Sequence, residues 1–169
     1  MEIRRIVTGH DAKGHAVVVS DAPIKGQELA NGKASFAVIW KTISSPVDNN
    51  NATDRAAEPV GLAQQGGSVL RVVDMPPGSR SPMHRTDSLD YGIVLAGPVD
   101  LELDNGHTTT VNAGEIVVQR GTIHAWINRG TKVARVAFVL LDANSAMIDG
   151  KPLPALIPHG TDEIRPTAI

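Results

Sequence analysis

The stretch that decides the fold is PPGSRSPMHRTDSLDYGIVLAG, residues 76–97. It opens with prolines and a glycine, which interrupt regular structure, and it closes with an apolar run that is typical of a strand. Successive side chains of an extended chain point to opposite faces, so His84, Thr86 and Asp90 share one face. The stretch therefore predicts extended chain with ligand-capable side chains on one side.

A second stretch, GEIVVQRGTIHAWIN at residues 114–128, repeats this pattern. His124 and Trp126 have the same parity, so we expect both on one face of a strand. A barrel that joins the two stretches would gather His84, Asp90 and His124 at one point. Two imidazoles and a carboxylate can hold a metal ion and leave positions open for water or substrate. The alternative is that these residues have structural roles. In that case His84 is a polar residue after a turn, Asp90 caps a strand end, and His124 is a hydrogen-bonded histidine of the barrel.

Short apolar runs rich in valine and isoleucine surround both stretches, and Gly, Pro, Asn and Asp separate these runs. This pattern is typical of many short strands in a sandwich or barrel. Helical periodicity is weak, so we predict an all-β fold. The expected strands cover residues 2–8, 15–20, 35–41, 68–74, 91–96, 99–104, 107–111, 115–119, 123–128 and 132–141.

One turn is predicted in detail. Asn105 and Gly106 lie between two alternating runs, and Asn-Gly supplies the positive φ values of a type I′ hairpin turn. Residues 1–67 are expected to hold N-terminal strands and an irregular loop, residues 68–141 the barrel, and residues 142–169 a C-terminal extension. A chain of 169 residues suits one domain.

Composition limits the partners. Sixteen basic and eighteen acidic side chains give a net charge of -2 without a basic run, so we expect no nucleic-acid or membrane partner. The expected partner is a small molecule or another protein chain. Without cysteine, any metal must be held by nitrogen and oxygen. No signal peptide or long apolar run is visible, so we expect a cytoplasmic, soluble protein.

The two stretches resemble the motifs of the cupin superfamily. In the first motif, the family's second histidine is replaced by Thr86 and its glutamate by Asp90. In the second, Gln119 stands where proline is usual, and the interval from Gly114 is one residue short. The resemblance covers about residues 68–141. The matching positions are Gly78, His84, Thr86, Asp90 and Gly97, and then Gly114, Gly121, His124 and Asn128.

The resemblance implies a double-stranded β-helix, or jelly-roll barrel, with extra N-terminal strands. It also implies a homodimer and one divalent ion (Fe, Mn, Ni or Zn) on His84, Asp90 and His124. The usual four-ligand site becomes a three-ligand site because threonine is a poor metal ligand. Asp90 is the least secure of the three because its side chain is one methylene shorter than that of glutamate.

What is known of cupins implies a metal-dependent enzyme acting on a small oxygenated molecule, such as a hydroxy acid, diketone or polyketide fragment. A dioxygenase is favoured because a three-ligand site leaves neighbouring positions for O2 and substrate. The alternatives are a lyase (dehydratase or decarboxylase) and a non-catalytic cupin that binds a small ligand. The expected catalytic residues are Thr86 and Arg120. The expected substrate contacts are Trp126, Gln119 and Tyr91, although parity turns Tyr91 outward unless a bulge redirects it.

Overall fold

The computed structural model describes residues 1–29 and 34–158, and all of their regular structure is β. None of these residues forms a helix with the length and hydropathy that a membrane crossing requires. The all-β prediction is confirmed. The strands are β1 (Glu2–His10), β2 (Ala16–Lys25), β3 (Gln27–Glu28), β4 (Ser35–Thr42), β5 (Ser68–Met75), β6 (Ser88–Ala96), β7 (Val99–Leu103), β8 (Thr108–Val111), β9 (Ile116–Arg120), β10 (His124–Ile127), β11 (Ala134–Asp142), β12 (Met147–Ile148) and β13 (Lys151–Pro152).

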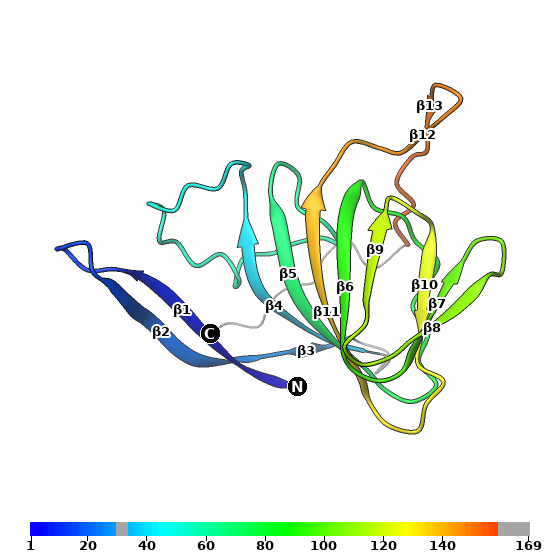
Figure 1. Ribbon diagram of the computed structural model, residues 1–169, viewed down its shortest axis with the longest axis horizontal. Helices are drawn as coiled ribbons and strands as arrows, with labels where there is room; N and C mark the ends of the chain where they lie inside the picture. The colour runs from blue at the N-terminus through cyan, green and yellow to red at the C-terminus, as the bar shows by residue number, and fades with distance from the viewer. Residues whose placement is uncertain (30–33, 159–169) are drawn as a thin grey trace.

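Two antiparallel sheets form the barrel (Figure 1). The larger has the order β3-β4-β5-β11-β6-β9, and the smaller has the order β10-β7-β8. Their inner faces share one apolar cluster, in which Val73, Val94 and Val136 of the large sheet meet Val99 and Trp126 of the small one. Burial of this apolar surface is the main force that holds the two sheets together.

Strand β6 illustrates how the sequence positions the site. Its side chains alternate strictly, so that Ser88, Asp90 and Val94 are buried while Leu89 and Tyr91 are only partly so. This alternation follows from the two-residue period of an extended chain. It turns a polar pair, Ser88 and Asp90, into the same interior that the apolar residues fill. Strand β6 therefore contributes both polar and apolar side chains to the barrel interior.

The hairpin at Asn105 and Gly106 forms as expected, but its predicted turn type is wrong. Gly106 has a φ of 78°, whereas the only described non-glycine residue with positive φ is Asp149. The amide of Leu103 donates to the carbonyl of His107 at 2.8 Å. This pattern is that of a longer loop ending in a left-handed glycine. The side chain of Asn105 accepts a bond from the His107 amide at 3.0 Å, which stabilises the alternative turn.

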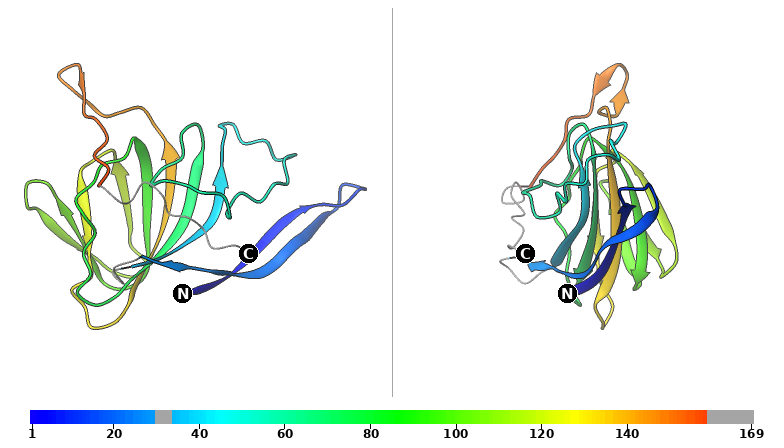
Figure 2. Two further views of the ribbon diagram at one scale, coloured as in Figure 1. Left: turned by 180° about the vertical axis from the view of Figure 1, so that it is seen from behind. Right: turned by 90° about the vertical axis from the view of Figure 1, so that its left-hand side faces the viewer.

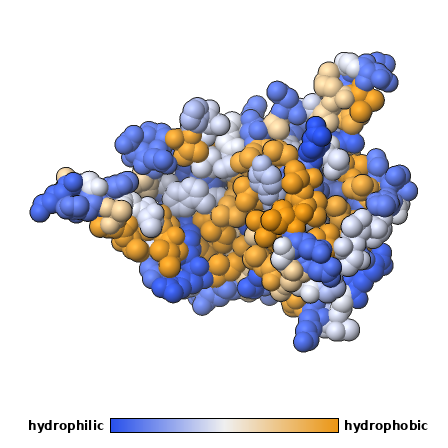
Figure 3. Space-filling view, in the orientation of Figure 1, coloured by the Kyte–Doolittle hydropathy of each residue, from blue (hydrophilic) through white to orange (hydrophobic). Residues whose placement is uncertain are grey.

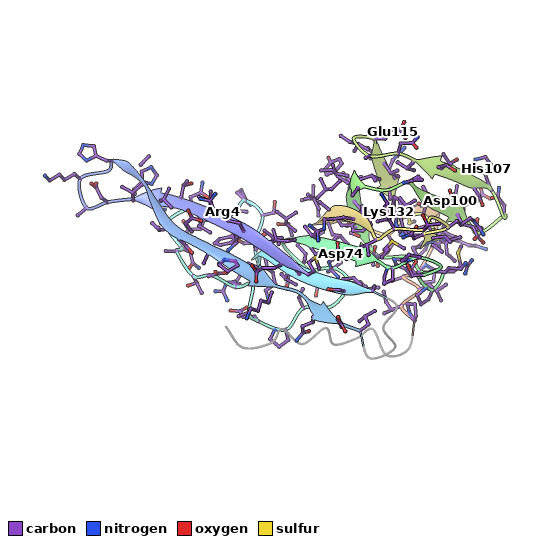
Figure 4. All side chains as sticks on the ribbon, turned by 90° about the horizontal axis from the view of Figure 1, so that it is seen from below. Arg4, Asp74, Asp100, His107, Glu115 and Lys132 are labelled. Carbon is purple, nitrogen blue, oxygen red and sulfur yellow. The ribbon has the colours of Figure 1, made fainter. Side chains whose placement is uncertain are left out.

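Strands β1 and β2 form a separate two-stranded hairpin, here called the N-terminal arm (residues 2–25), which projects from the barrel (Figures 1 and 2). Arg4 lies on this arm, at the opposite end of the molecule from Asp100 and His107 (Figure 4). At the base of the arm, Arg5 donates to the Ile39 carbonyl at 3.2 Å and pairs with Asp54. These contacts attach the arm to the barrel and to the irregular loop that precedes β5.

Candidate functional site

Two histidines meet at the edge of the barrel interior. His84 and His124 form an antiparallel bridge in which each amide donates to the other's carbonyl at 3.0 Å. Residues paired in this way present their side chains on the same face. Their ring centroids lie 4.2 Å apart. The structure thus confirms that the two sequence stretches come together, and it does so through a backbone pairing of the two histidines themselves.

The surroundings of this pair keep both rings neutral. The Nδ1 atom of His84 lies 2.9 Å from the Pro82 carbonyl, and that of His124 lies 2.9 Å from the Thr122 carbonyl. Since a carbonyl only accepts, each Nδ1 carries a proton and each Nε2 keeps its lone pair. Burial lowers the pKa of His84, and burial together with the neighbouring His84 lowers the pKa of His124 to about 4. Both imidazoles are therefore available as ligands or proton acceptors at neutral pH.

Asp90 is buried and is held by a hydroxyl group. The Oγ of Ser88 lies 2.6 Å from Oδ1 of Asp90 and 2.7 Å from Oγ1 of Thr86. One hydroxyl carries one proton, so these three groups form a chain in which Ser88 connects a carboxyl to a second hydroxyl. Burial raises the pKa of Asp90 to about 6, against the opposing effects of Ser88 and Arg71. This value lies close to neutrality, where a carboxyl group both gives and takes protons.

The fit of this site to a metal ion is incomplete. Two neutral imidazoles whose Nδ1 atoms are fixed by carbonyl groups are the usual partners of a divalent ion. Among residues 1–29 and 34–158, however, no group of three His, Cys, Asp or Glu side chains lies close enough to hold one. The structure gathers His84 with His124 but does not add Asp90 to them. The Oδ1 atom of Asp90 accepts instead from Ser88 on its own strand.

A cavity of about 200 Å³ lies beside these groups. Its polar lining includes His84, Thr86 and Asp90, and most of the remaining wall is apolar. Trp126 also lines it and stacks edge-on against Phe138 with ring centroids 5.3 Å apart. Trp126 is therefore both a core residue and a wall of the cavity, which agrees with its predicted inward direction.

The sequence prediction missed Arg71. This residue lies in the middle of β5, is 3% exposed and lines the cavity. A signal was present, because Arg71 has the same parity as Val69 and Val73 in an otherwise apolar strand. A charged residue at an inward position of a barrel strand requires a partner, and this marks it as a functional candidate.

The other predicted contacts divide between the two faces. Gln119 is buried opposite Asp90 in the β6–β9 pairing, so it points inward as expected, although it does not line the cavity. Arg120, the next residue, is exposed, and neither it nor Tyr91 lines the cavity. Tyr91 lies on the outward face of β6 because no bulge interrupts the β6–β9 pairing there. The structure therefore places Arg120 and Tyr91 away from the site.

Asn128, which matches the last position of the second motif, has a structural role. Its buried side chain donates to the carbonyls of Met75 at 2.7 Å and Lys132 at 2.8 Å, and it accepts from the Gly130 amide at 2.9 Å. These bonds close the connection between β10 and β11 against the end of β5. Asn128 thus stabilises the barrel end that carries β10, without facing the histidine pair itself.

Comparison with known proteins agrees with this architecture. The cupin domain family Cupin_2 matches residues 71–140. The cupin-domain-containing oxidoreductase fogC of Aspergillus ruber is 41% identical over 157 residues, which cover 88% of this chain and 77% of that protein. Phomopsin biosynthesis cluster protein C' of Diaporthe leptostromiformis is 41% identical over 170 residues, which cover 96% and 90% of the two chains.

Solved structures with low sequence identity share the fold. The cupin domain of Schizosaccharomyces pombe Cnp3 superposes with a TM-score of 0.53 at 14% identity, over 82% of this chain and 87% of that one. The polyketide cyclase RemF of Streptomyces resistomycificus gives 0.51 at 18% identity, over 82% and 83%. The double-stranded β-helix predicted from the motifs is therefore confirmed. The chain belongs to the cupin superfamily.

Proposed function

We propose that this cupin is an enzyme of the oxidoreductase type that acts on a small oxygenated organic molecule in natural-product biosynthesis. The observation that carries the proposal is that a pair of neutral imidazoles and a buried carboxyl–hydroxyl chain both border one largely apolar cavity. The names of the relatives support it, since several are called oxidoreductases and others biosynthesis cluster proteins. A hydroxy acid, a diketone and a polyketide fragment all meet this description of the substrate.

His84 and His124 would hold one divalent ion, either Fe, Mn, Ni or Zn, through their free Nε2 atoms. When bound, such an ion supplies a Lewis acid that polarises a substrate oxygen or activates O2. Asp90 would be the third ligand through Oδ2, because Ser88 contacts only Oδ1. Without the ion, burial raises the pKa of Asp90 to about 6, which suits this carboxyl to exchange protons near neutrality.

The residues of the chain itself account for proton movement. The Asp90 carboxyl exchanges its proton with the Ser88 hydroxyl, which in turn bonds the Thr86 hydroxyl at the cavity wall. A substrate oxygen beside Thr86 would therefore gain or lose a proton without contact with bulk water. Trp126 forms the flat wall that orients the substrate. The predicted roles of Thr86 and Trp126 are kept, whereas Arg120 and Tyr91 are left out of this scheme.

Among reaction types we favour dioxygenation, with a dehydratase or decarboxylase as the alternative. The test is an oxygen electrode with the Fe(II)-loaded protein and two probes, benzoylacetone as a diketone and mandelate as a hydroxy acid. A dioxygenase consumes O2 with at least one probe, and its activity stops under argon. Product formation that continues under argon identifies a lyase. Binding without product under both conditions identifies a non-catalytic cupin and refutes the proposal.

We also propose that the chain forms a homodimer in the cytoplasm, with no nucleic-acid or membrane partner. The support is an apolar outer face on the six-stranded sheet, where Leu95, Ile116 and Val118 are 51%, 61% and 55% exposed. Figure 3 shows hydrophobic residues gathered over the middle of this face. An exposed apolar patch of this kind marks a protein contact, and a second copy of the chain would cover it.

A further inference from the structure

Arg71 has hydrogen-bond donors to spare inside the barrel. Its Nη2 atom donates to the carbonyls of Gly61 at 2.8 Å and Leu62 at 2.5 Å. Its Nε atom is buried and finds no hydrogen-bond partner among the described residues. A guanidinium carries five N–H groups, and the irregular loop before β5 uses only one of its three nitrogens. The remaining donors belong to a side chain that lines the cavity.

This buried side chain is also cationic. Burial lowers the pKa of Arg71 to about 10, partly offset by the charge of Asp90, so the guanidinium stays protonated at neutral pH. In the described part of the chain, no carboxylate lies within ion-pairing distance of it. A buried cation without an adjacent anion carries a large desolvation cost. Arg71 therefore favours an anionic guest in the cavity, and the ionised form of Asp90, which lines the same cavity, partly opposes it.

Other interior donors are unpaired as well. The indole Nε1 of Trp126 is buried without a partner in the described residues, and so is the Nε2 donor of Gln119, which does not line the cavity. Trp126 lines the same cavity as Arg71. Buried polar atoms in folded proteins are nearly always bonded, so the unpaired donors of Arg71 and Trp126 in one cavity mark a place where a ligand supplies the acceptors.

Most of the remaining cavity wall is apolar and includes Phe36, Val73, Phe138 and Leu140. We propose that Arg71 anchors the oxyanion of a small, largely apolar substrate, either a carboxylate or the enolate of a 1,3-diketone. This inference rests on the proposed function, because it names the class of molecule that the same cavity would receive. A cavity of about 200 Å³ suits a molecule with one aromatic ring and a short substituent.

The test is a calorimetric titration of the full chain, treated with chelator, at pH 7. Benzoate is compared with benzamide, which has the same shape without charge, and benzoylacetone is compared with acetophenone, which has no acidic enol. We expect the wild-type protein to bind at least one anionic probe about ten- to hundredfold more tightly than its neutral partner. A preference for benzoate alone identifies a carboxylate, and one for benzoylacetone alone identifies an enolate.

Substitutions test whether Arg71 causes the preference for the anionic probe over its neutral partner. Arg71→Met should abolish it, while Arg71→Lys should retain part of it because the charge is kept. Arg129→Met is the matched control, since Arg129 is a surface guanidinium paired with Asp100 at 2.8 Å, and the preference should be unchanged. Equal binding of charged and neutral probes by wild type, or an intact preference in folded Arg71→Met, would overturn the proposal.

Arg71 also holds the loop at Gly61 and Leu62, so Arg71→Met could fail to fold. A measurement on the wild-type protein then decides. The Nε–H resonance of Arg71, assigned with Arg71→Lys, must shift when the preferred anion is added and must not shift with its neutral partner. An unmoved resonance contradicts the proposal. The titration requires neither metal nor turnover. Its failure would therefore refute only the role of Arg71, and an absence of O2 consumption would refute only dioxygenation.

Discussion

At the scale of single residues, backbone carbonyl groups determine what the two histidines can do. The carbonyls of Pro82 and Thr122 take the Nδ1 protons, so the Nε2 lone pairs of His84 and His124 are left free. Burial disfavours protonation of either ring. The folded protein therefore already orients both imidazole rings for a ligand, so binding does not have to order them.

Asp90→Asn should change how stability depends on pH. In chelator-treated wild type, the folded chain keeps the Asp90 proton up to about pH 6, whereas the ordinary value is 3.8. The stabilisation by the protonated carboxyl is complete below pH 3.8 and is lost as pH rises through 6. Asparagine has no such proton. As pH rises from 4 to 7, the free energy of unfolding of the variant should therefore increase by about 2–3 kcal/mol relative to that of wild type. Urea unfolding at each pH measures this difference.

The comparison of the two proteins at each pH removes the contribution of the histidines, which both share. A difference in free energy of unfolding that stays constant from pH 4 to pH 7 would contradict the raised pKa of Asp90. It would show that the carboxyl group ionises in the folded state as readily as in the unfolded chain.

Residue parity predicted much of the site but not its connections. It correctly turned His84, Thr86, Asp90 and Trp126 inward and directed Tyr91 outward. It could not foresee that Ser88 binds Asp90, because that contact depends on side-chain rotamers and on burial. Nor did it single out Arg71, because the carbonyls and the cavity that surround this residue come from segments far apart in the sequence.

At the scale of the strands, a single glycine on β6 makes room for the indole wall of the cavity. A Cβ atom added at Gly92 would lie 3.2 Å from the rings of both Trp126 and Phe138. Trp126 comes from β10 in the small sheet and Phe138 from β11 in the large one. Gly92 therefore sets how closely the two sheets approach next to the site.

Gly92→Val should destabilise the protein by about 1–3 kcal/mol, because the added methyl groups overpack the contact between Trp126 and Phe138. The high strand propensity of valine opposes this effect only weakly. Urea unfolding monitored by tryptophan fluorescence measures it. Ile93→Val is the control at the neighbouring, partly exposed position, where we expect a loss below about 1 kcal/mol. Equal or greater stability of Gly92→Val would show that the site wall is loosely packed.

The sequence predicted the strands better than their ends and turns. The alternation and turn residues located all the long strands, because those signals are local. Strand β6 begins at Ser88, three residues before the expected start at residue 91, since pairing with β11 extends it over polar residues that lack a strand signal. The turn at Asn105 and Gly106 differs from the expected type because the Asn105 side chain bonds the His107 amide.

At the scale of the whole molecule, the barrel has one face for chemistry and another for association. The inner face holds the cavity, while the outer face of the large sheet exposes apolar side chains from β6 and β9 (Figure 3). The N-terminal arm adds further exposed apolar residues, among them Ile6, Val18 and Val19. An isolated chain would leave these apolar side chains exposed to water, and a partner chain would cover them.

Val118→Glu should separate the proposed dimer, because a carboxylate in the middle of an apolar contact must be desolvated without a partner. Light scattering after size-exclusion chromatography should give a dimer mass for wild type and a monomer mass for the variant. Thr108→Glu places the same charge on the distant hairpin and should remain dimeric. A monomeric wild type, or a dimer that survives Val118→Glu, would exclude this face as the interface.

The central claim is that His84 and His124 form the metal-binding pair of the site, and elemental analysis tests it most directly. After incubation with Fe(II), Mn(II), Ni(II) or Zn(II) and desalting, wild type should retain about one ion per chain for at least one metal. His124→Ala should lose that ion, whereas His107→Ala, which removes an exposed histidine on the β7–β8 hairpin (Figure 4), should keep it. A wild type that retains no metal, or a folded His124→Ala that retains as much as wild type, would contradict the claim.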